Sequence, residues 1–169
     1  MKLKPTYIVE RVTDINLEDL KGEHIKGLIF DLDNTLMPPN TGNYPEDIFH
    51  WLELVKNDFK IVILSNNPEK DYVQKAGEIA GCLAYEKAGK PRTKAAIQAL
   101  KDIDLLPEQV VMVGDRPLTD IWVGQRLGMT TILVDPIMKH EEIEIVKFLR
   151  KLERISISPA KKFFSKNGQ

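Results

Sequence analysis

Four short runs of apolar residues recur along the chain, and amphipathic patterns separate them. The runs cover residues 25–30, 60–64, 109–113 and 130–134, with a weaker fifth run at 82–85. Continuous apolar runs of this length are typical of strands that are buried on both faces of a parallel sheet. Helical spacing appears over residues 45–56, 68–80, 93–103, 119–127 and 141–152. This alternation predicts right-handed βαβ units and an α/β fold with a doubly wound, Rossmann-like parallel sheet.

The length of 169 residues suits one domain of this kind. We divide the chain into an N-terminal extension (1–20), an α/β domain (21–155) and a basic C-terminal tail (156–169), and we expect both end segments to be peripheral. The single cysteine excludes an internal disulfide, the first residues lack the apolar stretch of a signal peptide, and no run approaches the ~20 apolar residues of a membrane span. We therefore expect a cytoplasmic protein. The net charge of −1 predicts no nucleic-acid partner.

Polar side chains follow the predicted strands at the edge of the sheet where ligands bind in such folds. Two acids come directly after the run 25–30, and a Ser-Asn-Asn segment follows the run 60–64. A lysine precedes the helix expected over 93–103, and two further acids follow the run 109–113. In order, the residues concerned are Asp31, Asp33, Ser65, Asn66, Lys90, Asp115 and Asp120. Their convergence on one edge predicts a single site.

The chemistry of this set favours phosphoryl transfer. Several carboxylates cannot share a site as bare anions, and oxygen ligands without His or Cys favour Mg²⁺. The Ser65 hydroxyl, the amides of Asn66 and Asn67 at a helix start, and the Lys90 ammonium are suited to phosphate. Each residue also has a simpler interpretation: Ser65 as a helix cap, Lys90 as a solvated loop lysine, and Asp120 as a surface acid.

The motifs DLDNT (31–35), LSNN (64–67), GKP (89–91) and GDRPLTD (114–120) resemble, in order and spacing, the four motifs of the haloacid dehalogenase (HAD) superfamily of phosphatases. The resemblance implies that Asp31 is a nucleophile that forms an aspartyl-phosphate and that Asp33 is the acid and base. It further implies that Thr35 supports the loop. By the same resemblance the phosphate ligands are Ser65, Asn66, Lys90 and Thr35, and the Mg²⁺ ligands are Asp31, the Asp33 carbonyl, Asp115 and Asp120, with Asp120 alternatively the partner of Lys90.

The spacing of the motifs leaves no room for a cap domain. Only residues 36–64 separate Thr35 from Ser65, and only residues 66–89 separate Ser65 from Lys90. Each interval is used up by one predicted helix and its connections. We therefore expect an open site that reaches phosphates on large molecules or surfaces. The alternative is a small substrate with a partner subunit as the lid.

A closer resemblance is to the YqeG-type family, which is grouped with the mitochondrial phosphatidylglycerophosphate phosphatases. It is carried by IKGLIFDLDNTLMP, WLELVKNDFKIVILSNN and VVMVGDRPLTDIWVGQRLGMTTILVDPI. It implies that the substrate is the lipid phosphatidylglycerophosphate. Arg116-Pro117 departs from the family pattern, and the role of Arg116 stays open.

The C-terminal stretch carries seven Lys/Arg and one acid over residues 147–169. We interpret it as a peripheral contact to anionic membrane at the inner face, with insertion of Phe163 and Phe164 as part of the hypothesis. The alternative is a packed helix followed by a solvated tail. Two other functions stay open: a capless phosphatase of a soluble sugar phosphate or nucleotide, and an inactive HAD-like module that binds protein or RNA.

Overall fold

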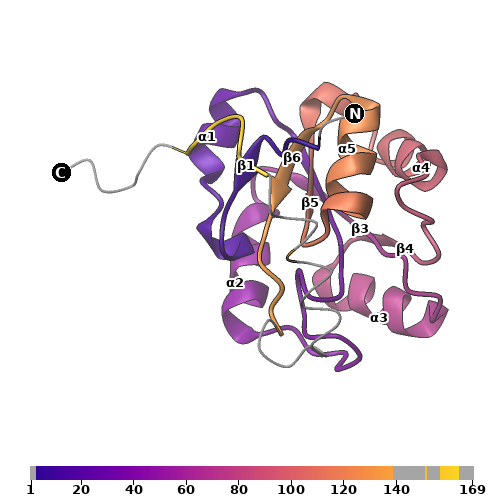
Figure 1. Ribbon diagram of the computed structural model, residues 1–169. Helices are drawn as coiled ribbons and strands as arrows, with labels where there is room; N and C mark the ends of the chain where they lie inside the picture. The colour runs from indigo at the N-terminus through magenta and orange to yellow at the C-terminus, as the bar shows by residue number, and fades with distance from the viewer. Residues whose placement is uncertain (1–2, 139–150, 152–156, 164–169) are drawn as a thin grey trace.

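The computed structural model describes residues 3–138, 151 and 157–163, and within them the chain forms one parallel sheet (Figure 1). The strands are β1 (Tyr7–Ile8), β2 (Gly27–Phe30), β3 (Lys60–Leu64), β4 (Leu83–Tyr85), β5 (Val110–Gly114) and β6 (Thr130–Leu133). Their order is β1-β6-β5-β2-β3-β4, and every neighbouring pair is parallel. The predicted doubly wound α/β fold is therefore confirmed, with the first predicted strand, β2, at the centre.

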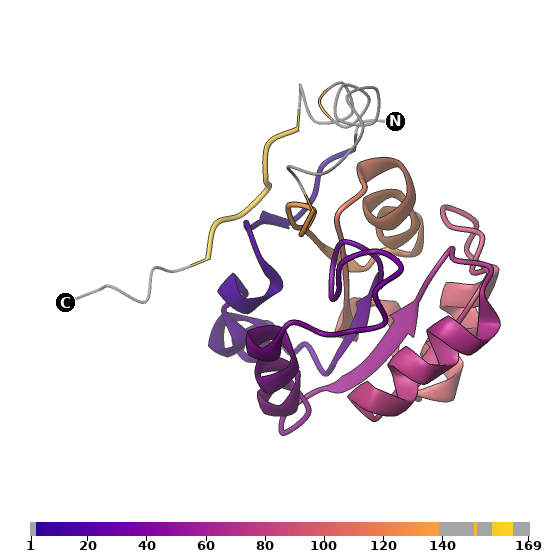
Figure 2. The same ribbon diagram turned by 90° about the horizontal axis from the view of Figure 1, so that it is seen from below.

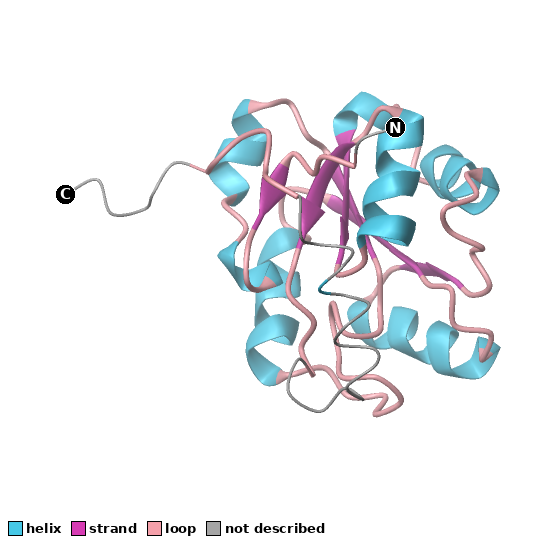
Figure 3. Ribbon diagram, viewed as in Figure 1, coloured by secondary structure: helices cyan, strands magenta, loops and turns pink. Residues whose placement is uncertain are grey.

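Helices alternate with these strands (Figure 3). They are α1 (Leu17–Gly22), α2 (Glu46–Val55), α3 (Lys70–Ala80), α4 (Lys94–Asp102) and α5 (Trp122–Leu127), together with the 3-10 turns η1 (Val12–Asp14) and η2 (Pro107–Gln109) and the wide π-type turn η3 (Pro117–Ile121). The helix predicted over 119–127 is thus divided into η3 and α5. The helix predicted over 141–152 lies outside the described residues.

Each face of the sheet has its own apolar core. Because side chains alternate along a strand, Leu28 and Phe30 of β2 pack into the cluster under α1, α2 and α3, whereas Ile29 packs into the cluster under α4 and α5. Figure 1 shows α1 and α2 on one side of the sheet and α4 and α5 on the other. Burial on both faces explains why the central strands are continuous apolar runs.

The strand register brings three carboxyl ends to the same level. Phe30, the last residue of β2, lies opposite Ile63 of β3 on one side and Val113 of β5 on the other. Parallel strands in this register send their following loops to one edge of the sheet. The loops that begin at Asp31, Ser65 and Asp115 therefore lie side by side.

Residues 3–20 pack against the sheet, whereas the sequence analysis expected the N-terminal extension (1–20) to be peripheral. In the described part of this segment, β1 pairs with β6, with Tyr7 opposite Ile132, and Tyr7, Val12 and Leu20 are buried in the core. The reason is that a two-residue edge strand contains too few apolar residues to give a recognisable run. Its place depends on β6, more than 100 residues away in the sequence.

The C-terminal segment 157–163 lies along the outer side of β1 (Figure 2). Backbone N–H groups of Ala160 and Lys161 donate to the carbonyls of Pro5 and Thr6 at 3.0 and 2.8 Å. The ring of Phe163 stacks on Tyr7 with centroids 3.9 Å apart. The expectation that Phe163 inserts into a membrane is therefore not met in this structure, because its ring is packed against the protein.

Candidate active site

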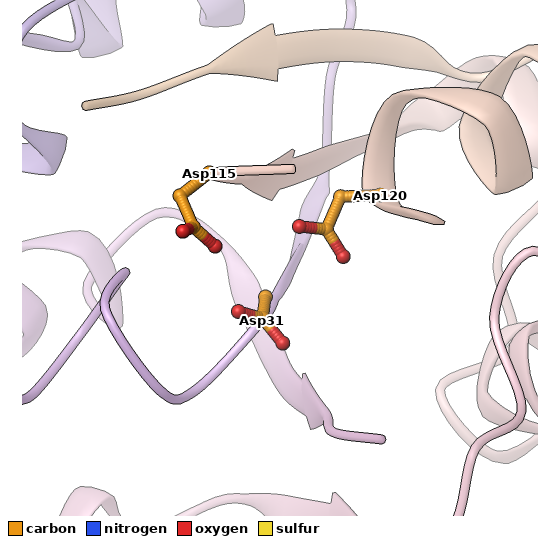
Figure 4. Close-up of side chains that lie close together, drawn as sticks. All are labelled: Asp31, Asp115 and Asp120. Carbon is orange, nitrogen blue, oxygen red and sulfur yellow. The ribbon is translucent and has the colours of Figure 1, made fainter. Parts of the chain in front are cut away.

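The carboxyl ends of β2 and β5 bring three acids together at one cavity. Asp31, Asp115 and Asp120 each offer a carboxylate oxygen within 4.8 Å of the others (Figure 4). The Asp31 N–H donates to the Val113 carbonyl at 2.9 Å, which continues the β2–β5 pairing and fixes the position of Asp31. The cavity has a volume of about 190 Å³, and every predicted site residue except Thr35 lines it. Arg116 and Thr119 line it as well.

Lys90 lies at the floor of this cavity between two of the acids. Its Nζ is 2.8 Å from Asp31 Oδ1 and 2.7 Å from Asp120 Oδ1, and its side chain is only 1% exposed. This excludes the interpretation of Lys90 as a solvated loop residue. The Asn66 side chain holds the backbone of Lys90, because its Nδ2 donates to the Lys90 carbonyl and its Oδ1 accepts from the Lys90 N–H. The sequence analysis assigned the Asn66 amide to phosphate, and this role stays a prediction, while the Asn66 side chain serves to hold Lys90.

The wide turn η3 presents Asp120 to Lys90. The Arg116 carbonyl accepts from the N–H groups of both Asp120 and Ile121, at 2.9 and 3.4 Å. Asp120 Oδ2 accepts from the Arg116 N–H at 3.0 Å, while Oδ1 receives Lys90. A Cβ at Gly114 would overlap the Asp120 carboxylate, so glycine is required there. With both oxygens engaged, Asp120 fits the role of Lys90 partner better than that of metal ligand.

Thr35 and Ser65 are both buried beside the acids. The Thr35 hydroxyl lies 3.3 Å from Asp31 Oδ2 and 3.5 Å from Asp115 Oδ1, so it ties the two carboxylates to the loop. Ser65 Oγ accepts from the Asn67 N–H at 3.1 Å, and an accepting hydroxyl retains its own proton for donation. Helix α3 begins at Lys70, so Ser65 is not its cap, and Asn66 does not stand at a helix start.

Asp33 occupies a different environment from the other acids. Its carboxylate receives hydrogen bonds from Asn67 Nδ2 at 3.0 Å and from the Tyr72 hydroxyl at 2.7 Å. Neither donor is charged. The sequence analysis considered Asn67 only as an amide for an anion, not as a partner of Asp33, and it did not select Tyr72. Tyr72 stands on α3 in a pattern typical of a half-buried helix face, and only the fold brings it to Asp33.

Burial of several charges in one place dominates the electrostatics. Burial raises the pKa of Asp31 to about 6, against the lowering effect of Lys90. Burial also raises the pKa of Asp120. For Lys90, burial lowers the pKa, but the neighbouring Asp120 and Asp31 outweigh it and the net shift is upward. Asp31, Asp115 and Asp120 thus face one buried ammonium, which leaves an excess of two negative charges when all are ionised.

A divalent cation fits this excess. Carboxylate oxygens are the ligands that Mg²⁺ prefers, and a charge of +2 would neutralise the cluster. Lys90 binds Asp31 Oδ1, whereas Asp31 Oδ2 and Asp115 Oδ1 both lie near the Thr35 hydroxyl. We therefore regard Asp31 and Asp115 as the side chains best suited to hold the cation.

Comparisons with known proteins are consistent with this geometry. A family model described as HAD-hydrolase-like matches residues 87–141. The chain is 36% identical to "Probable phosphatase YqeG" of Bacillus subtilis, over 94% of this chain and 91% of that protein. It is 33% identical to "Phosphatidylglycerophosphate phosphatase 1, chloroplastic/mitochondrial" of Arabidopsis thaliana, over 88% of this chain and 45% of that protein.

Solved structures share the fold at low sequence identity. A HAD phosphatase from Thermococcus onnurineus matches with a TM-score of 0.56 and 14% identity, over 78% of this chain and 97% of that one. A protein of Vibrio cholerae described as "putative 3-deoxy-D-manno-octulosonate 8-phosphate phosphatase" matches with a TM-score of 0.56 and 18% identity, over 77% of this chain and 78% of that one. At this identity the likeness concerns the fold alone.

Proposed function

The chain belongs to the HAD-like phosphatases of the YqeG type, and from this membership we propose that it is a Mg²⁺-dependent phosphomonoesterase that converts phosphatidylglycerophosphate to phosphatidylglycerol. The observation that carries the substrate is the alignment of 88% of this chain with a phosphatidylglycerophosphate phosphatase of Arabidopsis thaliana. A "Phosphatidylglycerophosphatase GEP4, mitochondrial" of Saccharomyces cerevisiae aligns over 88% of this chain as well, at 26% identity.

The first step transfers the phosphoryl group to Asp31. A carboxylate oxygen of Asp31 attacks phosphorus, the bond from phosphorus to the ester oxygen breaks, and Asp33 gives its proton to the departing oxygen, which leaves as an alcohol. Lys90 lies 2.8 Å from Asp31 Oδ1, where it orients the nucleophile and balances the charge that the phosphate brings. Burial raises the pKa of Asp31, whereas the neighbouring Lys90 lowers it and so favours the ionised form that attacks phosphorus.

The second step returns Asp31 to its starting state. A water molecule attacks phosphorus of the aspartyl-phosphate, Asp33 accepts the proton of that water, and the bond between phosphorus and the Asp31 oxygen breaks to release inorganic phosphate. Ser65 offers its hydroxyl to a phosphoryl oxygen, since it lines the cavity and its oxygen already accepts from Asn67. Asp31 and Asp115, together with the Asp33 carbonyl, would hold Mg²⁺, which when bound neutralises phosphoryl oxygens and the buried acids.

The short intervals between the motifs support a large substrate. Between Thr35 and Lys90 the chain contains only α2, β3, α3, β4 and their connections, so neither interval contains a cap domain. A phosphate group at a membrane surface needs such an open approach. Among the described residues, no helix has both the length and the apolar character needed to cross a membrane.

We also propose a peripheral contact with anionic membrane through the basic C-terminal stretch. Lys161 and Lys162 are exposed in the segment beside β1, and Lys161 lies 3.2 Å from Glu23. Near an anionic surface each such charge contributes about 1 kcal/mol of attraction. Removal of residues 155–169 is expected to weaken binding to anionic vesicles, and unchanged binding would refute this part of the proposal.

The activity is tested by Mg²⁺-dependent phosphate release from phosphatidylglycerophosphate in mixed micelles, beside a panel of soluble sugar phosphates and nucleotides. We expect a kcat/KM for the lipid far above that for every soluble ester, and no release by the Asp31→Asn variant. Activity on soluble esters alone would assign a soluble substrate instead. Absence of Asp31-dependent release from all of them would refute the phosphatase function itself.

A further inference from the structure

Asp33 is held by two neutral donors, and this arrangement goes beyond the roles assigned above. The Tyr72 hydroxyl donates to Oδ1 at 2.7 Å, and Asn67 Nδ2 donates to Oδ2 at 3.0 Å. We propose that Tyr72 and Asn67 are positioning residues, which hold the Asp33 carboxyl group in the orientation that proton transfer to the leaving group requires. The inference rests on the proposed phosphatase function.

Asn67 is itself fixed by its surroundings. Its N–H donates to Ser65 Oγ at 3.1 Å, its Oδ1 accepts from the Glu69 N–H at 2.9 Å, and its carbonyl accepts from the Lys87 N–H at 3.1 Å. These hydrogen bonds allow only one orientation of the Asn67 side-chain amide, in which Nδ2 is directed at Asp33. The link to Ser65 also couples the position of Asp33 to the predicted phosphate-binding hydroxyl.

Tyr72 is fixed from the other direction. It stands in the first turn of α3, and its hydroxyl also lies 3.3 Å from Met37 Sδ, in the loop that follows Asp33. The backbone of Asn40 and Gly42 also interacts with the phenol group, so the same loop lies beside it. Tyr72 is thus held between α3 and the 36–42 loop, and its hydroxyl restricts rotation of the Asp33 carboxyl group.

Both hydrogen bonds leave room for the transferred proton. A carboxylate has about four lone-pair sites, and Tyr72 and Asn67 occupy two of them. One site on each oxygen is left for the proton that moves to the leaving group in the first step and from water in the second. Accurate placement of such a group matters, because a misplacement of about 1 Å can reduce the rate by about 100-fold.

The test is the Tyr72→Phe variant, which removes the hydroxyl and retains the ring. The matched control is Tyr44→Phe, because the Tyr44 hydroxyl makes a hydrogen bond of 2.8 Å to the Ala76 carbonyl of the same helix and does not contact Asp33. The readout is kcat/KM with Mg²⁺ for two substrates, an alkyl phosphate and p-nitrophenyl phosphate. An alkoxide needs a proton to leave, whereas p-nitrophenolate leaves without one. Because kcat/KM reports the first irreversible step, later release of phosphate does not obscure the comparison.

We expect Tyr72→Phe to lower kcat/KM for the alkyl phosphate by about 10- to 100-fold. This loss is part of the 10²- to 10⁴-fold acceleration that general acid catalysis supplies. For p-nitrophenyl phosphate we expect kcat/KM to fall by less than about 3-fold. Tyr44→Phe should change both substrates equally and little. An equal loss on both substrates with Tyr72→Phe, or no loss, would overturn the proposal while phosphatase activity persists. Failure of wild-type protein to release phosphate in an Asp31-dependent way would instead refute the phosphatase function.

Discussion

The ion pair at the cavity floor and an ion pair on the outer surface have almost the same length but different surroundings. Lys90 Nζ lies 2.7 Å from Asp120 Oδ1, and both side chains are 1% exposed. Arg11, which precedes η1, lies 2.6 Å from Asp47 of α2, and these side chains are 49% and 50% exposed. Water screens the surface pair, whereas the buried charges depend on each other. Length alone therefore says little about the energy of an ion pair.

The two ion pairs also differ in whether the protein needs them for stability or for chemistry. The surface pair links η1 to α2 and can be lost with little consequence. The buried pair is surrounded by further charges, Asp31 and Asp115, which no simple stability argument requires. A protein under selection for stability alone would replace such a cluster by apolar residues. Its presence is best explained by chemistry at this edge of the sheet.

The largest effect is expected where Lys90 is removed. Lys90→Met leaves Asp31 and Asp120 buried without their cation, so we expect the free energy of unfolding to fall by about 3–5 kcal/mol, together with loss of activity. Urea unfolding in EDTA at pH 8 measures the change. The control is Lys94→Met, which removes an exposed lysine at the start of α4. A Lys90→Met protein as stable as Lys94→Met would refute the interdependence of the buried charges.

Mg²⁺ should act on the buried cluster and leave the surface pair unaffected. At a concentration of about 100 times its dissociation constant, Mg²⁺ is expected to raise the free energy of unfolding by about 2.7 kcal/mol, because it binds the folded chain only. Asp115→Asn should remove most of this gain, and Asp47→Asn should retain all of it. Thermal unfolding with and without the cation measures both. An equal gain in the two variants would show that the cation binds elsewhere.

Neutralising Asp31 should stabilise the metal-free protein and inactivate it. Its pKa rises from 3.8 to about 6 on folding, so the folded chain holds the proton more tightly between these values. Stability of the wild type in EDTA should therefore fall as pH rises from about 4 to about 6, and then level off. Asp31→Asn lacks this slope, and we expect it to be roughly 1–3 kcal/mol more stable than wild type at pH 8.

The control for this measurement is Asp104→Asn. Asp104 is exposed and has a positive φ of 54°, which asparagine adopts as readily. Its pH profile should follow that of the wild type. An Asp31→Asn profile parallel to the wild type between pH 4 and 6 would show that the Asp31 ionisation does not contribute.

The smallest effect belongs to the surface pair. A double-mutant cycle with Arg11→Ala and Asp47→Ala should give a coupling free energy of about 0.2–1 kcal/mol, which decreases as salt concentration rises. The pKa of Asp47 is lowered, chiefly by its hydrogen bond with Arg11, so the coupling should also weaken at acidic pH. A coupling above about 2 kcal/mol would contradict the view that exposure makes this pair weak.

The sequence was informative where structure depends on neighbours in the chain. The central strands are continuous apolar runs, and the acids that follow them can be located because a parallel sheet gathers its carboxyl ends. On these grounds Asp31, Lys90, Asp115 and Asp120 were assigned to one site, and the structure brings them together around one cavity.

The sequence was uninformative where a contact depends on how distant elements pack. Nothing in the sequence around Tyr72 indicates that the first turn of α3 faces Asp33. A two-residue strand such as β1 is recognisable only beside its partner β6. The bonds of Asn66 to the Lys90 backbone are another example, because they require the β3 and β4 loops to meet. Such contacts arise from tertiary geometry, which the pattern of apolar residues does not encode.

The wide turn η3 makes the length of the segment from Gly114 to Ile121 as important as its composition. The Arg116 carbonyl accepts hydrogen bonds from the N–H groups of both Asp120 and Ile121. This turn therefore contains one residue more than a turn of α-helix. Deletion of a single residue would rotate the following positions by about 100°, since an α-helix has 3.6 residues per turn. Asp120 would then point away from Lys90 although every side chain of the cluster remained in the sequence. Among related proteins, insertions and deletions should therefore avoid this segment, and an alignment with a gap inside it should be read as misplaced.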